Sequence, residues 1–189
     1  MRSALMCIAL TAALLNPAFA HTGVHQVNSF ASGIAHPLSG ADHILTMVTI
    51  GLWSVLAGGR AMWVWPSAFV GAMLAGFAAA TLGLHVPLVE AAIWSSITVL
   101  GLLVALGVKA PVGVGAATAG LFAFFHGHAH GTEAAAGLAA YAAGFMLATA
   151  GLHVAGIGLG LLADCSIGKA ALRTMGGLAV LGALGLMVG

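Results

Sequence analysis

Long apolar segments joined by short turns make up most of this chain, and they restrict it to a membrane protein. Only 5% of the 189 residues are charged and 61% are hydrophobic, which leaves too little polar surface for a soluble domain of this size. Because a bilayer offers no hydrogen-bond partners, each apolar segment has to satisfy its own backbone, as a helix does. The sequence therefore predicts an all-α, polytopic membrane helical bundle in contact with the lipid bilayer. Its 28 glycines predict that the helices touch along small residues.

The first twenty residues have the features of a secretory signal peptide. Arg2 precedes an apolar run over residues 4–15, and small residues stand immediately before His21. We predict a cleavable signal peptide over residues 1–20 and a single transmembrane domain over residues 21–189. An uncleaved first helix is the alternative, but the apolar run is shorter than the roughly 20 residues that a span needs.

Hydropathy divides the mature chain into six predicted membrane spans. They cover residues 28–57, 62–82, 88–108, 112–128, 133–163 and 167–188. Short loops that carry Lys and Arg stay in the cytoplasm, and one topology with a periplasmic mature N-terminus satisfies this rule for every loop. The basic loop residues are Arg60, Lys109, Lys169 and Arg173. We therefore predict a multi-pass protein of a bacterial inner membrane. The net charge of +1, without a basic cluster, argues against nucleic acid as a partner.

The predicted spans also divide into two halves of three. Each half has an odd number of spans, so the two halves enter the membrane from opposite sides, and each opens with a histidine-bearing helix. This arrangement is typical of transporters built as 3+3 inverted repeats. The residue-level similarity between the halves is weak, so the repeat is a hypothesis for the architecture. The sequence does not indicate an oligomeric state.

Two histidines and a carboxylate lie inside the first apolar span. An ionised side chain at mid-bilayer costs on the order of 3 kcal/mol, so such groups point to a function. His36 and His43 are seven residues apart and would share one face of an unbroken helix. Pro37 and Gly40 predict a kink or a short unwound turn between them. We predict that His36, Asp42 and His43 converge on a cation site.

A second polar cluster covers residues 126–133. On a continuous helix His126, His130 and Glu133 share one face at spacings of four and three residues, while His128 points away. The glycines within the cluster would break that helix. The alternative interpretation is a histidine-rich loop that caps two helices, with Glu133 at the N-terminus of the fifth span. We predict His126, His130 and Glu133 as metal ligands.

Other polar residues lie near the predicted outer face. Glu90, just inside the third span, is a further candidate ligand, although it can also pair with a histidine or lie in the headgroup layer. His21 and His25 follow the predicted cleavage site and, with His128, are predicted to capture metal ions; a disordered polar tail is the alternative for the first two. His153, deep in the fifth span, is expected to bond to a neighbouring carbonyl rather than to an ion.

Imidazole and carboxylate ligands together suit borderline divalent metals such as Ni²⁺, Co²⁺, Zn²⁺ or Cu²⁺. Cys7 would leave with the signal peptide, so Cys165 is the one cysteine of the mature chain and thiolate metal chemistry is not expected. The chain has no P-loop, so transport would be facilitated or coupled to another ion. We expect no tightly bound cofactor.

The chain resembles the HupE/UreJ family in two motifs, which read HPxxGxDH from His36 and FHGxAHGxE from Phe125. The resemblance spans nearly the whole mature chain. It implies a secondary permease, not an enzyme, that carries nickel, in some members cobalt, and is associated with hydrogenase or urease maturation. Nickel is implied by this resemblance, whereas the residues themselves indicate only a divalent transition metal.

Three other functions compete with transport. A membrane metal sensor or accessory protein would bind metal ions without carrying them. A haem-ligating redox protein could use paired histidines, but it does not need Asp42 beside His43. An intramembrane metallohydrolase needs a general base, for which Glu133 or Glu90 would serve, but no HExxH helix supports it.

Overall fold

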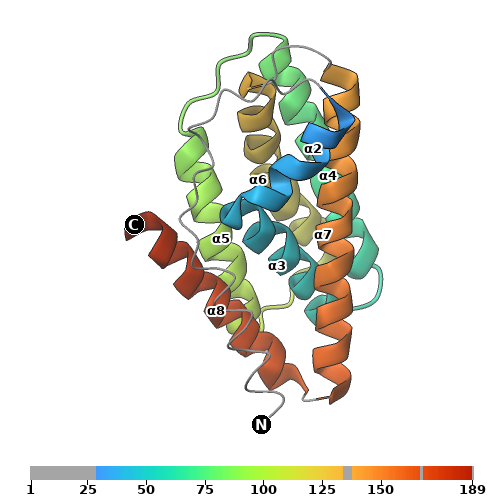
Figure 1. Ribbon diagram of the computed structural model, residues 1–189. Helices are drawn as coiled ribbons and strands as arrows, with labels where there is room; N and C mark the ends of the chain where they lie inside the picture. The colour runs from blue at the N-terminus through green and yellow to red at the C-terminus, as the bar shows by residue number, and fades with distance from the viewer. Residues whose placement is uncertain (1–28, 134–137, 167, 189) are drawn as a thin grey trace.

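The computed structural model describes residues 29–133, 138–166 and 168–188, and helices account for nearly all of them. Their order along the chain is α2 (Phe30–Ser39), α3 (Ala41–Ala57), α4 (Ala61–Thr81), α5 (Val89–Ala105), α6 (Val112–Glu133), α7 (Leu138–Ser166) and α8 (Lys169–Val188) (Figure 1). The prediction of an all-α helical bundle is confirmed. The predicted signal peptide over residues 1–20, with His21 and His25, lies outside the described residues.

Apolar helices make the chain a multi-pass membrane protein. Among the described residues, three helices are long and apolar enough to cross a bilayer: Ala61–Thr81, Leu138–Cys165 and Lys169–Leu186. The pair formed by α2 and α3 is a fourth if it counts as one broken span. Helix α5 is apolar but has 17 residues. Helices thus occupy all six predicted segments, while three or four of them meet the length and hydropathy of a span.

The predicted interruption of the first span is confirmed, and it lies at Gly40. Pro37 remains inside α2, and the chain turns by 84° between α2 and α3. The backbone of Gly40 is extended, with φ −95° and ψ 118°. Ser39 helps to end α2, because its hydroxyl donates to the carbonyl of His36 at 2.7 Å. As a result α2 lies across the bundle, while α3 continues along it (Figure 1).

The helices pack through glycines that face each other in pairs. A Cβ on any of these glycines would collide with the backbone or a side chain of the partner helix, so only glycine permits the observed approach. This confirms the predicted contact along small residues. The pairs are Gly76 with Gly127 between α4 and α6, Gly33 with Gly144 between α2 and α7, Gly51 with Gly156 between α3 and α7, and Gly101 with Gly176 between α5 and α8.

Two buried tryptophans hold the loop between α5 and α6. The indole of Trp53 donates to the carbonyl of Val108 at 2.9 Å, and that of Trp65 donates to the carbonyl of Val112 at the same distance. Their ring centroids are 4.1 Å apart. The tryptophans therefore tie α3 and α4 to the carbonyl of Val108 in the loop and to that of Val112 at the start of α6.

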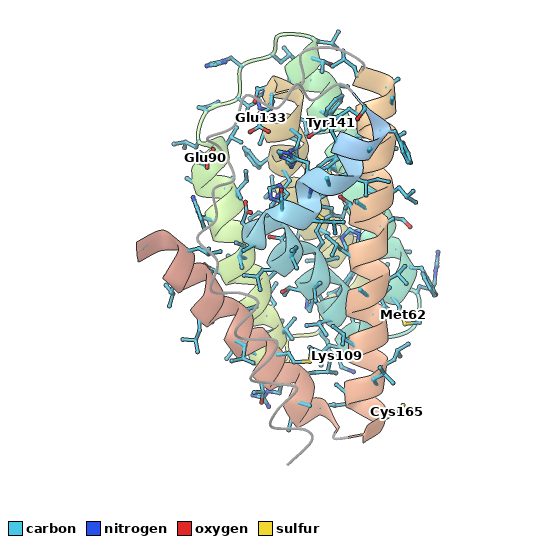
Figure 2. The ribbon with its side chains drawn as sticks, in the orientation of Figure 1. Met62, Glu90, Lys109, Glu133, Tyr141 and Cys165 are labelled. Carbon is cyan, nitrogen blue, oxygen red and sulfur yellow. The ribbon has the colours of Figure 1, made fainter. Side chains whose placement is uncertain are left out.

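The two ends of the bundle differ in their polar side chains. Figure 2 shows Glu90, Glu133 and Tyr141 at one end, and Lys109 and Cys165 at the other. The first end carries the predicted metal ligands of α6, and the second carries the loop around Lys109. A site at the first end is thus separated from the basic loops by the length of the helices.

Candidate metal centre

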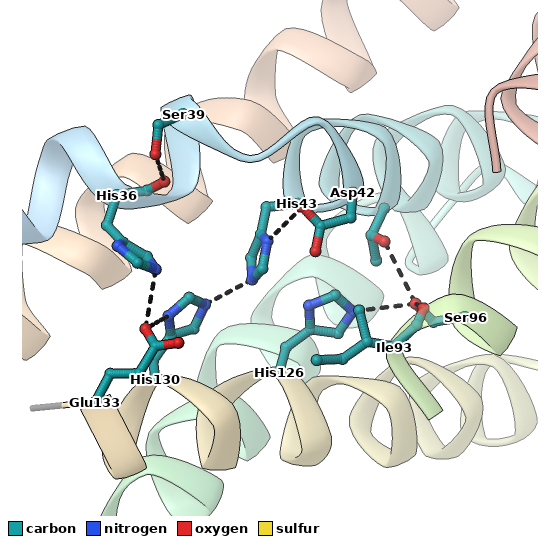
Figure 3. A network of polar contacts seen from close by, with 10 residues as sticks. His36, Ser39, Asp42, His43, Ile93, Ser96, His126, His130 and Glu133 are labelled. Carbon is teal, nitrogen blue, oxygen red and sulfur yellow. Dashed lines mark hydrogen bonds and ion pairs between the residues drawn. The ribbon is translucent and has the colours of Figure 1, made fainter. Parts of the chain in front are cut away.

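The two predicted histidine clusters meet at one place in the structure. Figure 3 shows His36 from α2 and His43 from α3 facing His130 and Glu133 from α6. Nε2 of His130 lies 2.6 Å from Nε2 of His43, although the residues are 87 positions apart in the sequence. Nε2 of His36 lies 3.4 Å from Oε2 of Glu133. The bend at Gly40 makes this possible, because it lets α2 and α3 present their imidazoles to the same face of α6.

Three of these residues form a group that can hold a metal ion. One ligand atom from each of His36, His130 and Glu133 lies within 4.8 Å of the others. Nδ1 of His130 is 3.9 Å from Oε2 of Glu133, and the two residues are one helical turn apart. His130 is fully buried, whereas His36 and Glu133 keep part of their side chains exposed. We call His36, His130 and Glu133 the three-ligand group; it is buried on one side and open on the other.

Helix α6 stays continuous through the cluster because its glycines pack against α4. A Cβ on Gly127 would collide with the carbonyl of Met73, and one on Gly131 would lie 2.5 Å from the carbonyl of Phe77. The α6 glycines therefore serve close packing and do not break the helix. Consequently α6 continues as a helix through Glu133, beyond residue 128 where we predicted the fourth span to end.

Asp42 orients His43 within the cluster. Its Oδ1 lies 3.0 Å from Nδ1 of His43, and both side chains are buried. A carboxylate oxygen at this distance favours the tautomer of His43 with its proton on Nδ1, which leaves a lone pair on Nε2 towards Nε2 of His130. A carboxylate behind an imidazole in this way raises the basicity of the opposite nitrogen, as it does behind metal-binding histidines.

Ser96 of α5 contacts the fourth imidazole of the cluster, that of His126 on α6. The hydroxyl of Ser96 donates to the carbonyl of Ile93 at 2.6 Å and lies 3.0 Å from Nε2 of His126, so this nitrogen is the donor. Nδ1 of His126 is then an acceptor, and it has no hydrogen-bond partner among the described residues. The ring lies 5.0 Å from that of His43. Thr46 completes the network, 3.3 Å from the Ser96 hydroxyl.

Sequence reasoning missed Ser96, Thr46 and Tyr141. Ser96 and Thr46 lie in apolar helices among other serines and threonines and carry no signal of their own. Tyr141 on α7 lies 6.1 Å from His36 by ring centroids, and its hydroxyl has no partner in the described part of the chain. Phe145, one turn further on, packs against His130 at 4.1 Å. These rings close the buried side of the three-ligand group.

A separate cavity of about 200 Å³ lies beside the cluster. It is lined by both exposed and buried residues: His85, Val86, Val89, Glu90, His128, Ala129, Thr132 and Glu133. The structure thus places Glu90 outside the three-ligand group, while Glu133 belongs to both places. His128 is buried, and its Nε2 lies 2.8 Å from the carbonyl of Leu84, so its ring points away from the other α6 histidines. The cavity leads from the exposed loop before α5 to Glu133.

The expected carbonyl bond of His153 is absent from the described residues. Neither ring nitrogen has a hydrogen-bond partner within residues 29–133, 138–166 and 168–188, although the side chain is 1% exposed. The prediction for this residue is therefore wrong. Its imidazole lies in α7, with its ring centroid 5.0 Å from that of Phe69.

The fold and the cluster define a helical membrane protein with a buried histidine and carboxylate centre suited to a divalent transition metal. The chain belongs to the HupE/UreJ family. Residues 8–187 match the family model described as HupE / UreJ protein. It is similar to Protein HupE of Rhizobium leguminosarum bv. viciae, with 45% identity over 179 residues that cover 94% of this chain and 93% of that protein. No solved structure matches the chain. The family is linked to nickel and cobalt uptake for hydrogenase or urease, and its members are generally considered transporters.

Proposed function

We propose that this protein is a secondary permease that carries Ni²⁺, and also Co²⁺, across the bacterial inner membrane to supply hydrogenase or urease maturation. One observation carries the proposal. Two motifs from distant parts of the chain bring four imidazoles and two carboxylates together inside an apolar helical bundle. Burying such groups is costly, and in membrane proteins they mark ion pathways. Family membership supplies the choice of nickel.

The bound ion would be held first by the three-ligand group of His36, His130 and Glu133, with His43 beside it. Two or three imidazoles and a carboxylate suit Ni²⁺ and Co²⁺ better than hard cations, which prefer oxygen alone. Asp42 acts through His43 at 3.0 Å. His126 presents an acceptor Nδ1 on the inner side of the cluster. Few ligands keep binding weak enough for the ion to leave again, which a permease requires.

The cavity lined by Glu90 is the proposed entrance. Two carboxylates, Glu90 and Glu133, line it together with His85 and His128, so its field attracts cations. Because Glu133 also contacts His36, an ion can pass from the cavity to the cluster by exchanging ligands on one carboxylate. Capture by His21 and His25 is part of the same proposal, although both residues lie outside the described part of the chain.

The proposal includes six membrane spans, a removed signal peptide and a periplasmic mature N-terminus. The bent pair of α2 and α3 counts as one broken span, and α5 and α6 as two more. Support comes from the separation of the cluster from the loop around Lys109 (Figure 2), since basic loops stay in the cytoplasm. The cluster would then face the periplasm, where nickel arrives.

The pattern of helix pairing supports the inverted repeat. If the two halves are repeats of each other, α2 and α3 together correspond to α6, α4 corresponds to α7, and α5 corresponds to α8. The extensive packing of α4 on α6 then corresponds to that of α7 on α2 and α3, and the contact of α5 with α6 corresponds to that of α8 with α3. The α5–α8 pair maps onto itself. A twofold axis in the membrane plane would relate these pairs, whereas the contacts of α3 with α4 and with α5 have no counterpart of similar extent between α6 and α7 or α8 in the described part of the chain.

The test is uptake of radioactive nickel by cells that lack their own nickel transporters. Intact protein is compared with His130→Ala, Glu133→Gln and the control Lys169→Ala, at matched expression in the membrane. We expect uptake by the intact protein and the control, and none above background for the two cluster variants. Absence of uptake by intact protein that still binds nickel after purification would refute transport and favour the sensor.

A haem site finds no support in the cluster. His43 and His130 contact each other through Nε2 atoms 2.6 Å apart, which leaves no space for a porphyrin between them. A Soret band in the purified protein would contradict this conclusion.

A further inference from the structure

His153 is a buried imidazole that the proposed cluster does not use. It lies in α7 and is 1% exposed, and neither ring nitrogen has a hydrogen-bond partner among the described residues. Leaving a buried polar side chain without partners is costly, so an unpartnered group of this kind needs a reason. Its surroundings supply one.

A hydroxyl and a thioether lie on the helix faces next to this imidazole. Thr149 is one helical turn before His153 on α7, and both residues are buried. The hydroxyl of Thr149 donates to Sδ of Met73 on α4 at 3.7 Å. Phe69, one turn before Met73, places its ring 5.0 Å from that of His153. The side chains of His153, Thr149 and Met73 thus lie on adjoining turns of α7 and α4 in an apolar part of the bundle.

The position of His153 continues the line of the cluster into the membrane. The ring of Phe69 lies 5.9 Å from that of His126 and 5.0 Å from that of His153, so it contacts both imidazoles. His126 in turn lies 5.0 Å from His43. Along α7, His153 is about 18 Å from Tyr141 at the cluster end and equally far from Cys165 at the opposite end. The imidazole is therefore midway between the two ends of the bundle.

We propose that His153, with Thr149 and Met73, forms a second and transient site for a divalent transition-metal ion, and that Phe69 separates this site from His126. The inference rests on the proposed permease function and extends its path towards the cytoplasm. Nitrogen and sulfur donors suit borderline ions such as Ni²⁺ and Co²⁺. A site with few donors binds weakly, so the ion moves on once a partner site is free.

The first test measures binding and transport separately on the full-length protein. Purified protein is reconstituted into lipid vesicles, and initial uptake of radioactive nickel is compared with nickel binding in detergent. The variant is His153→Leu, and the control is Ser54→Ala, which removes a buried hydroxyl that bonds within its own helix. We expect His153→Leu to keep nickel binding at the three-ligand group and to lose uptake by on the order of tenfold or more.

Uptake by His153→Leu at the rate of the control would overturn the second site and leave the permease function standing. Loss of both binding and uptake in a monodisperse variant would also overturn it, because His153 would then serve the outer cluster. Thr149→Val and Met73→Leu are expected to slow uptake less than His153→Leu does.

A spectroscopic test does not depend on transport. In a Cys7→Ser and Cys165→Ser background, His153→Cys places a thiolate at the proposed site, and Ser54→Cys places one elsewhere in the core. A metal ion that reaches position 153 gives a cobalt–thiolate charge-transfer band when Co²⁺ is added, and we expect this band for His153→Cys alone. Its absence with the outer cluster saturated would refute the site. If the band appears while the intact protein transports nothing, the permease proposal fails and the site stands.

Discussion

The Asp42 carboxylate is predicted to set nickel affinity without binding the ion itself. Its Oδ1 lies 3.0 Å from Nδ1 of His43, on the far side of that ring from His130. Asp42→Asn keeps the shape and an acceptor oxygen but removes the charge. Asp42→Ala removes the acceptor as well, and leaves Nδ1–H of a buried imidazole without this partner. The two variants therefore separate the charge of Asp42 from the contact of its oxygen with the imidazole.

The magnitude follows from the position of Asp42 behind the imidazole. Loss of a partner that orients a metal-binding histidine costs about 10-fold to 100-fold in affinity, or about 1.4 to 2.7 kcal/mol. Asp42 is 6% exposed, so solvent screens this contact little. Because Asp42→Asn preserves the acceptor, we expect it near the lower end of that range. Asp42→Ala belongs near the upper end.

The assay is a nickel titration of the purified protein, together with the concentration dependence of uptake in vesicles. We expect the dissociation constant to rise in the order intact protein, Asp42→Asn, Asp42→Ala, and the apparent KM for uptake to follow it. Lys169→Ala serves as the control. Equal affinity of intact protein and Asp42→Ala would refute the positioning role. Complete loss of binding in Asp42→Asn would show instead that the carboxylate is a ligand.

Two further predictions concern packing and entry. Gly127→Ala places a Cβ against the carbonyl of Met73, so it should destabilise the folded protein by about 1 to 3 kcal/mol, measured as thermal unfolding in detergent. Gly113→Ala, where a Cβ meets no neighbour within 4 Å, should not; equal stability of both variants would contradict the packing argument. Glu90→Gln should raise the apparent KM for nickel uptake and leave the maximal rate unchanged, because Glu90 lines the cavity but lies outside the three-ligand group. A fall in maximal rate at unchanged KM would place Glu90 on the path inside the membrane.

The sequence predicted the helices well where local chemistry decides their boundaries. Pro37 and Gly40 indicated an interruption, and the chain bends by 84° there. The continuation of α6 through the cluster was not predicted because Gly127 and Gly131 are helix breakers by intrinsic propensity. Their contacts with α4 outweigh that propensity, and such contacts cannot be deduced from α6 alone.

For the candidate site, the sequence identified the residue types but not how they combine. The spacing placed His126, His130 and Glu133 on one face of a helix, yet nothing in it joined them to His43, 87 residues before His130. Glu90 was grouped with the cluster because both lie near the same predicted membrane face. Residues at the same depth in the membrane need not lie on neighbouring helices. Ser96 was missed because a serine in an apolar helix commonly bonds to its own backbone, as Ser95 and Ser96 both do.

In the first motif, Gly40 leaves the space that the side chains of Asp42 and His43 occupy. At Gly40 a Cβ would lie 2.7 Å from Oδ1 of Asp42 and 3.1 Å from Nδ1 of His43. A larger residue would displace the carboxylate that orients the imidazole. Gly40 therefore both ends α2 and leaves room for the Asp42–His43 pair, which explains why this glycine stands between His36 and Asp42 in the motif.

In the second motif, the glycines that follow the histidines pack α6 against α4. His126 and His130 repeat at four residues and face the bent helices, while Gly127 and Gly131 repeat at the same interval and face α4. The histidine face can approach α2 and α3 only if the helix is held firmly from behind. The glycines provide this support, because they let the backbones of α4 and α6 touch. Each histidine of the pair is thus followed by the glycine that fixes its depth, so Gly127→Ala should weaken nickel binding as well as stability.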